Sequence, residues 1–139
     1  MSATSVQFTV AAHLMAALAF RPGKEIHSAV LAESVNTDPS FVRKSLSKLS
    51  RAGLVSSSRG KNGASKLARS AKKITILDIY RARSAPAAFA VHRYPEKRIC
   101  PISVGIKGCM NSILAQAQGS FEKALARITL ADVVEQLRK

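Results

Sequence analysis

Two cysteines, Cys100 and Cys109, are the residues of this 139-residue chain with the most distinctive chemistry. They are too few for a disulfide scaffold, and a tetrahedral zinc site would need histidines as further ligands. Cys100 directly precedes Pro101, the first residue of an expected helix, and follows Lys97 and Arg98 closely. A helix N-terminus and nearby cations both favour the reactive thiolate form. Cys100 is therefore a candidate redox sensor, and the alternative is an inert buried thiol.

The two cysteines are nine residues apart. On one helix this separation places them on opposite faces and about 13 Å apart along the axis, beyond the reach of a disulfide. A disulfide involving Cys100 or Cys109 would need local unwinding or a bond between subunits. We expect Cys109 to be a small packing residue, and we keep both cysteines as candidate redox-sensing residues.

Hydroxyl and basic side chains recur at spacings of three and four between residues 40 and 51, as they do on one face of a helix. This stripe comprises Ser40, Arg43, Lys44, Ser47, Lys48 and Arg51. Val42, Leu46 and Leu49 would lie on the opposite, buried face. Such basic and hydroxyl side chains donate hydrogen bonds to phosphates and to base edges, so the stripe indicates nucleic-acid recognition.

The charge distribution agrees with this interpretation. The chain has 22 Lys and Arg against 8 Asp and Glu, a formal net charge of +14. Residues 1–40 carry a net charge of −1, residues 41–83 carry +11, and the remainder carries +4. A folded basic block of this density is typical of a contact with nucleic acid, and the alternative is a solvated basic face.

The stripe lies on an expected helix that runs to Ala52. Asp38 is a suitable N-cap, Pro39 suits the first helical position, and Gly53 is a good C-terminal stop. A shorter helix over residues 29–35, with Ser28 as its N-cap, precedes it across the polar turn 36–38. Two short helices joined in this way predict a helix-turn-helix.

A small β-hairpin is expected directly after these helices. Residues 54–58 and 64–67 are compatible with two strands, and residues 59–63 form the turn between them. A basic hairpin in this position is typical of a wing that reaches phosphates or the minor groove. The alternative is an ordinary surface hairpin.

Further helices are expected over residues 6–20, 74–81 and 130–137, the last two capped by Thr75 and Thr129. His13, within the first of them, is expected to be a packing residue. Residues 84–95 contain prolines and predict an irregular connection.

From residue 101 to 128 the apolar side chains follow a helical seam. These are Ile106, Met110, Ile113, Ala117, Phe121, Ala124 and Ile128. A helix about 40 Å long with such a seam cannot be covered by a core of this size, which favours pairing with a second copy. The alternative is that the helix folds back on its own domain.

The expected fold is therefore mainly α with a small β wing: a winged helix-turn-helix over residues 1–83, a sensor or connecting loop over 84–100, and a dimerisation helix with a C-terminal helix over 101–139. The longest apolar run, residues 10–20, is too short to span a membrane, and no basic leader precedes it. We expect a cytoplasmic protein. Paired acids, a phosphate-binding glycine loop and a nucleophile with its base are not recognisable, so an enzyme is not expected.

Four segments, in order, resemble the Rrf2 family of bacterial transcriptional regulators. They are PSFVRKSLSKLSRAGLV (39–55), RGKNGASKLAR (59–69), ITILDIYRA (74–82) and ITLADVVEQL (128–137). The resemblance implies a homodimer that binds double-stranded DNA at a pseudopalindromic operator. It implies that Ser40, Phe41, Arg43, Lys44, Ser47 and Lys48 enter the major groove, and that Arg59, Lys61 and Asn62 serve the wing. The family's wing commonly continues Gly-Gly-Tyr, where this chain has Gly63-Ala64-Ser65.

Several members of the family hold an iron–sulfur cluster through three cysteines before the dimerisation helix. This chain has only Cys100 and Cys109 there, so one subunit cannot supply a complete cysteine-ligated cluster, although His92 or a ligand from the partner could assist. Cys100-Pro101 resembles the cluster-free subgroup of the family, and no cofactor is expected.

The resulting hypothesis is a homodimeric, sequence-specific DNA-binding repressor that responds to thiol oxidation or electrophiles through Cys100. A first alternative is a winged-helix regulator controlled by a small molecule or a protein partner, with no redox chemistry. A second is a winged-helix protein that binds RNA or another protein rather than an operator.

Overall fold

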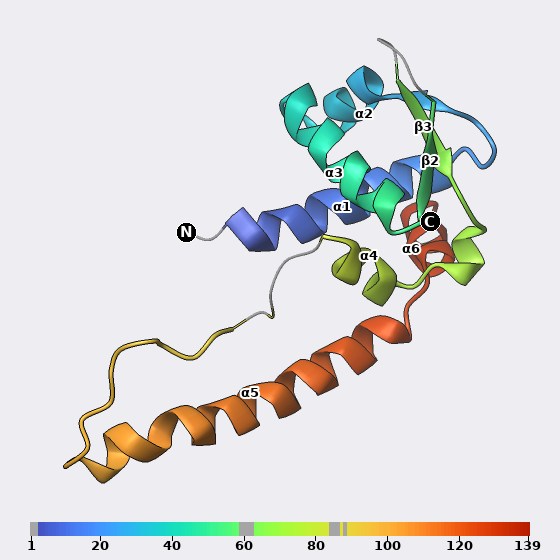
Figure 1. Cartoon of the computed structure of the whole chain (residues 1–139). Coiled ribbons are helices and arrows are strands. Elements are labelled where there is room, and N and C mark those ends of the chain that lie inside the picture. The colour runs from blue at the N-terminus through green and yellow to red at the C-terminus, as the bar shows by residue number, and fades with distance from the viewer. Residues whose placement is uncertain (1–2, 59–62, 84–86, 88) are drawn as a thin grey trace. The chain divides into compact units, whose positions relative to one another are not determined.

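The computed structural model describes residues 3–58, 63–83, 87 and 89–139 (Figure 1). In these residues six α-helices accompany a three-stranded antiparallel sheet, which confirms the mainly α fold with a small β wing. The elements are α1 (Ala3–Ala19), β1 (Ile26–His27), α2 (Ser28–Val35), α3 (Pro39–Arg51), β2 (Val55–Ser57), β3 (Ala64–Leu67), the 3-10 helix η1 (Ala71–Lys73), α4 (Ile76–Ala82), α5 (Pro101–Ala126) and α6 (Leu130–Leu137).

The chain forms two compact units. Met1–Ala85 together with Leu125–Lys139 form the N-terminal unit, and Pro86–Ala124 form the second. None of the helices that the structure describes is long and apolar enough to cross a membrane.

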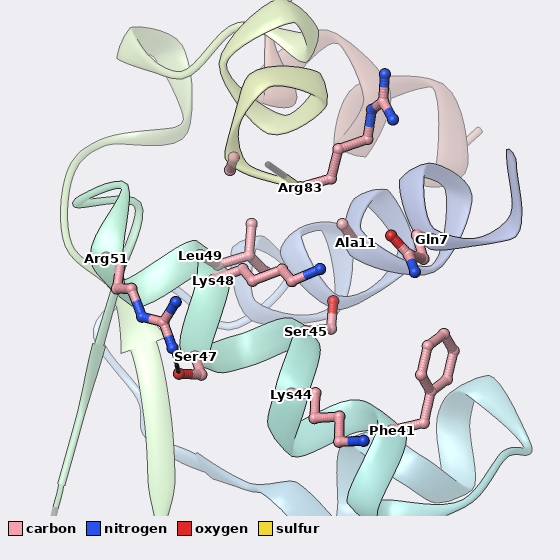
Figure 2. Close-up of a pocket in the computed structure, with 11 residues that line it drawn as sticks. Gln7, Ala11, Phe41, Lys44, Ser45, Ser47, Lys48, Leu49, Arg51 and Arg83 are labelled. Atoms are coloured by element: carbon pink, nitrogen blue, oxygen red, sulfur yellow. Dashed lines mark hydrogen bonds between the residues drawn. The ribbon is translucent and has the colours of Figure 1, made fainter. Parts of the chain in front are cut away.

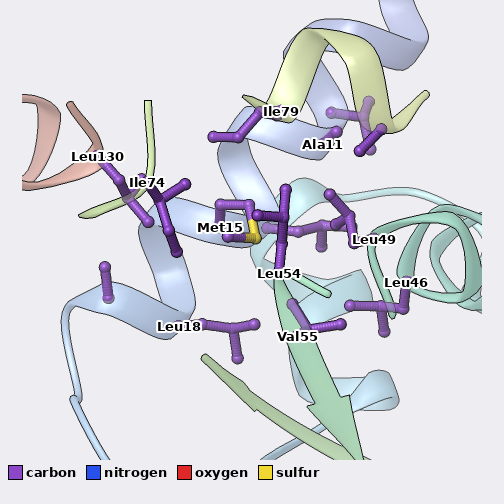
Figure 3. Close-up of a cluster of buried hydrophobic side chains, with 14 of the residues drawn as sticks. Ala11, Met15, Leu18, Leu46, Leu49, Leu54, Val55, Ile74, Ile79 and Leu130 are labelled. Atoms are coloured by element: carbon purple, nitrogen blue, oxygen red, sulfur yellow. The ribbon is translucent and has the colours of Figure 1, made fainter. Parts of the chain in front are cut away.

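α1 is the central element of the N-terminal unit and packs against α2, α3, α4, α6 and β3. Its side chains Leu14, Met15 and Leu18 are fully buried. Figure 3 shows buried side chains from α1, α3, β2, α4 and α6 converging on one cluster, which includes Leu49 and Leu130. Burial of this apolar surface is the main force that holds these helices together.

His13 lies on the outer side of α1. It is exposed, and its Nε2 lies 2.9 Å from the hydroxyl of Ser34 on α2. The expectation of a packing residue was wrong, because this imidazole makes a surface hydrogen bond between two helices instead.

The helix-turn-helix is present as expected. Asn36 ends α2 in the left-handed conformation, with φ of 65°, and Asp38 caps α3 ahead of Pro39. The expected N-cap of α2 was wrong: the cap is His27, without a side-chain hydrogen bond, and Ser28 is the first helical residue. The reason lies in the sheet, because the Ser28 N–H donates to the carbonyl of Gly63, 3.2 Å away.

The hairpin expected after α3 is confirmed for its strands, with Val55 opposite Leu67 in an antiparallel register. A third strand, β1, was not predicted. It pairs with β3 through Ile26 and Ser65, which makes β3 the central strand. Two residues are too few to produce a periodic pattern in a sequence.

α4 and α6 begin in the same way. Thr75 and Thr129 are N-caps whose hydroxyls accept backbone hydrogen bonds, and Asp78 and Asp132 complete both capping boxes. The two caps pair with one another as an isolated antiparallel bridge between Thr75 and Thr129. Leu130 is fully buried, so α6 belongs to the N-terminal unit. The sequence-based boundary places residues 101–139 in one region, because the pairing of Thr75 with Thr129 leaves no periodic signal along the chain.

In the second unit, the described part of residues 87–99 has no helix or strand, as expected for the connection. α5 then runs for 26 residues and ends two residues before the predicted end. None of its residues is buried: Ile106 and Met110 are half-buried, and Ile113 and Phe121 are 50% and 39% exposed. The expected apolar seam is therefore open in the single chain.

Candidate nucleic-acid interface

α3 has one apolar and one basic face. Val42, Leu46 and Leu49 are buried, with exposed fractions of 6% or less, and they fix the rotation of the helix. Their burial leaves the opposite face to solvent. The exposed stripe residues are Ser40, Arg43, Lys44, Ser47 and Arg51. The structure thus brings together the basic and hydroxyl side chains that the sequence predicted.

The first turn of α3 is fixed by Asp38. Its carboxylate accepts hydrogen bonds from the Ser40 N–H at 3.1 Å and from the Ser40 hydroxyl at 2.9 Å. The backbone hydrogen bond lowers the pKa of Asp38 most, the hydroxyl adds to this, and the nearby charges of Arg43 and Lys44 contribute less. Because the Ser40 hydroxyl donates its proton to Asp38, its oxygen is best placed to accept a hydrogen bond from DNA.

Two of the predicted contact residues are only partly exposed. Phe41 is half-buried and packs against the core, and Lys48 is half-buried between α3 and α1. Figure 2 shows the Lys48 side chain directed toward α1, whereas Arg51 turns to Ser47. The Arg51 guanidinium lies 3.4 Å from the Ser47 hydroxyl. Arg43, Lys44 and Ser47 thus form the accessible centre of the face, with Phe41 and Lys48 along one edge.

The predicted wing residues Arg59, Lys61 and Asn62 lie outside the described residues. The strands on either side are described, and β3 carries Lys66, which is half-buried. Ser57 on β2 and Ser65 on β3 are joined by a 3.0 Å contact between their hydroxyls. These paired strands flank the segment in which the basic turn is predicted.

The cysteines lie in the second unit. Both are free and exposed, which contradicts the alternative of a buried Cys100. The Cys100 sulfur accepts a hydrogen bond from the Ser103 N–H in the first turn of α5, at 3.4 Å. The neighbouring turn is held by a 2.7 Å hydrogen bond from the Lys97 N–H to the Ser103 hydroxyl. Cys109, expected to be a packing residue, is exposed in the single chain.

Two residues near the face were missed from the sequence. Gln7 on α1 and Arg83, which follows α4, line a cavity together with Lys48. Arg83 is only 6% exposed, and its guanidinium carbon lies 3.9 Å from the centre of the Tyr80 ring. The only signal for Gln7 is a polar residue within an apolar helix, and Arg83 is one cation among many in the basic residues 41–83.

Comparisons with known proteins agree with this geometry. A family model for Rrf2, described as an iron-dependent transcriptional regulator, matches residues 4–136. The chain is 32% identical over 132 residues to YwnA of Bacillus subtilis (strain 168), named as an HTH-type transcriptional regulator, and the match covers 94% of this chain and 96% of YwnA.

Two solved structures share the fold. A transcriptional regulator from Lactobacillus plantarum superposes with a TM-score of 0.78 at 22% identity, over 96% of this chain and 90% of that chain. The oxidised form of CymR from Staphylococcus aureus gives a TM-score of 0.70 at 23% identity, over 97% of both chains. The family model covers nearly the whole chain, so this chain belongs to the Rrf2 family, whose members are transcriptional regulators and not enzymes.

Proposed function

We propose that the chain is a homodimeric repressor that recognises a pseudopalindromic operator in double-stranded DNA in the cytoplasm. The observation that carries this proposal is the face of α3. Its rotation is fixed by three buried side chains, its first turn is capped by Asp38, and it presents Arg43, Lys44 and Ser47 to solvent. A helix of this kind fits the major groove, where arginine and lysine donate to guanine and serine bonds to several bases.

The α5 seam supports a dimer. Ile113 is 50% exposed and Phe121 is 39% exposed on a helix without a buried residue. Pairing with a second α5 would remove these side chains from water, and a twofold axis through the pair would give two recognition helices with a fixed spacing. Such symmetry is what a pseudopalindromic site requires.

Cys100 is the proposed sensor. It is exposed, its sulfur contacts the first turn of α5, and any change of charge or size at the sulfur would act on the start of the proposed dimer helix. The S. aureus relative CymR is described in an oxidised form, which favours redox control for this chain as well. Control by a small molecule or a protein partner without redox chemistry remains the alternative.

An iron–sulfur cluster does not fit the residues present. The chain has two cysteines and no third. Cys100 directly precedes α5, and Cys109 lies nine residues further along, within the helix. In the described part of the chain no three His, Cys, Asp or Glu side chains are grouped so that they could hold a metal ion. We therefore propose that the regulator works without a cluster held by one subunit.

The test is selection of bound sequences from a random duplex pool, with the protein reduced and then oxidised. We expect enrichment of an inverted repeat, and a change in its affinity on oxidation. Salt-dependent binding without any enriched sequence, or preferential binding of RNA, would contradict the proposed function, since a non-specific binder shows the salt dependence alone. If the repeat is enriched and Cys100→Ser still responds to oxidant, the sensor assignment is wrong.

A further inference from the structure

A cavity of about 330 Å³ lies in the N-terminal unit beside the predicted DNA face of α3. It is bounded by α1, α3 and the end of α4, and it includes Gln7, Ala11, Ser45, Lys48, Leu49 and Arg83. Small-molecule sites in proteins commonly measure roughly 300–1,000 Å³ and combine an apolar lining with a few polar groups. The cavity is therefore of a size that suits a compact ligand.

Polar groups from two helices meet at this cavity. Figure 2 shows Lys48 extending from α3 toward α1, with Gln7 on the α1 side, and Ser45 lines the same cavity. Lys48 is half-buried at this cavity. Lys44, Arg51 and Arg83 also line the cavity, and no Asp or Glu is among the described residues that do so. The electrostatic potential of the cavity is positive, and its complement is an anion.

The floor of the cavity is apolar. Ala11 is 3% exposed and Leu49 is 1% exposed, and the ring of Phe41 forms part of the wall. A DNA phosphate would satisfy the cations but would leave this floor without an apolar partner. A ligand with a carboxylate at one end and a compact apolar body would match both parts.

We propose that this cavity binds a small carboxylate with an aromatic or short aliphatic body, and that the ligand weakens DNA binding. The carboxylate pairs with Lys48 and accepts a hydrogen bond from Ser45, and the apolar body lies on Ala11 and Leu49. This proposal rests on the proposed function for its regulatory part, because Lys44, Ser47 and Lys48 belong to both the cavity and the predicted DNA face. Coupling of this kind is reciprocal, so DNA must also weaken binding of the carboxylate.

The binding step can be tested without DNA. The full chain labelled with ¹⁵N is titrated with benzoate, and with benzamide as the uncharged match. We expect benzoate to shift the backbone amides around Ser45, Lys48 and Ala11, and to bind roughly tenfold more tightly than benzamide, as expected of a hydrogen bond to a charged group. Equal affinities, or shifts confined to other parts of the chain, would overturn the proposal.

Substitutions of residues that line the cavity test whether benzoate binds there. Lys48→Met keeps the aliphatic stem that packs beside α1 and removes the charge, so benzoate affinity should fall roughly tenfold while the spectrum remains that of a folded protein. Gln7→Ala tests the α1 side of the cavity, and it should lower benzoate affinity by less than Lys48→Met does. Lys72→Met removes an exposed charge on η1, outside the cavity, and should leave benzoate affinity unchanged. Equal losses in Lys48→Met and Lys72→Met would contradict the assignment.

The final arm adds the selected duplex and separates the two proposals. We expect benzoate to lower duplex affinity in the native protein and not in Lys48→Met. If benzoate binds at the cavity but no duplex is preferred, the proposed function is wrong and the ligand site stands. If the duplex is bound specifically and benzoate does not bind, the cavity proposal alone is wrong.

Discussion

Asp38 accepts both the backbone N–H and the hydroxyl of Ser40, at 3.1 and 2.9 Å, at the first turn of α3. The two residues, separated only by Pro39, have different roles. Asp38 satisfies a backbone N–H that the start of the helix would otherwise leave without a partner, and Ser40 is the first residue of the predicted DNA face. A change at the cap should therefore affect both the stability of α3 and its contact with DNA.

The cap makes stability depend on pH in a defined direction. The pKa of Asp38 is lowered by its hydrogen bonds, so its stabilising contribution is present above the unfolded-state pKa and is lost as the pH falls through the folded-state pKa. Urea unfolding of the native protein and of Asp38→Asn should differ most at neutral pH and converge below about pH 4. Ser40→Ala removes the hydroxyl hydrogen bond to Asp38 but keeps the backbone one. Its free energy of unfolding should therefore still exceed that of Asp38→Asn at neutral pH, by a smaller amount than the native protein's does. A constant difference across this range would contradict the role of the charge.

Arg43 and Lys61 should differ in what they contribute to binding. Arg43 is exposed on the α3 face, so Arg43→Ala should cost about 1–3 kcal/mol on the preferred duplex and relax the sequence preference. Lys61, in the predicted wing turn, should contact phosphate, so Lys61→Ala should weaken all duplexes about equally and reduce the salt slope by about 1. Competition binding at several salt concentrations measures both effects. If specificity survives in Arg43→Ala, the face of α3 has been assigned wrongly.

Local sequence signals predicted the helix-turn-helix, the wing strands and the long helix, because each has its own periodicity or cap. Asp38 and Pro39 mark the start of α3 and Gly53 follows its C-cap Ala52, so the predicted helix agrees with the observed one to within one residue. The errors arose where distant segments meet. β1 exists only because β3 pairs with it, and that pairing also engages the N–H of Ser28, the residue predicted as a cap.

The same reasoning explains what was missed around the site. The stripe on α3 follows from spacing alone, but the position of Lys48 beside α1 depends on how two helices pack. Gln7 and Arg83 are 76 positions apart in the sequence and line one cavity. No pattern along the chain could have brought them together.

α6 should be required for the stability of the N-terminal unit. Leu130 is fully buried, and its N–H donates to the Ile74 carbonyl at 2.8 Å. Leu130→Ala should lower the free energy of unfolding by about 2–5 kcal/mol, because it leaves a cavity in the core. Leu137→Ala makes the same change on the same helix at a side chain that is 57% exposed, and should cost at most about 0.5 kcal/mol. Urea unfolding of both variants provides the comparison, and similar costs would contradict the packing of α6.

Cys100 should react faster than Cys109 with iodoacetamide. Both thiols are exposed, so access does not separate them, and the difference lies in the Ser103 N–H that donates to the Cys100 sulfur at the start of α5. Backbone N–H groups at a helix N-terminus favour reaction of a cysteine with electrophiles. Mass spectrometry of peptides from partially alkylated protein measures the two rates, with Cys109→Ser as the matched control. Equal rates would remove the structural argument for Cys100 as the sensor.

The dimer should depend on the open seam of α5. Ile113 is 50% exposed in the single chain, so Ile113→Asp should leave the N-terminal unit folded while it places a charge in the proposed interface. We expect sedimentation to show a monomer for this variant and a dimer for the native protein. Ser112→Asp adds the same charge at an exposed position outside the seam and should remain dimeric. The monomer should keep salt-dependent binding to duplex DNA but lose its preference for an inverted repeat, because one recognition helix can read only one half-site. A monomeric Ile113→Asp protein that still prefers the inverted repeat would show that the spacing of the two helices is set elsewhere.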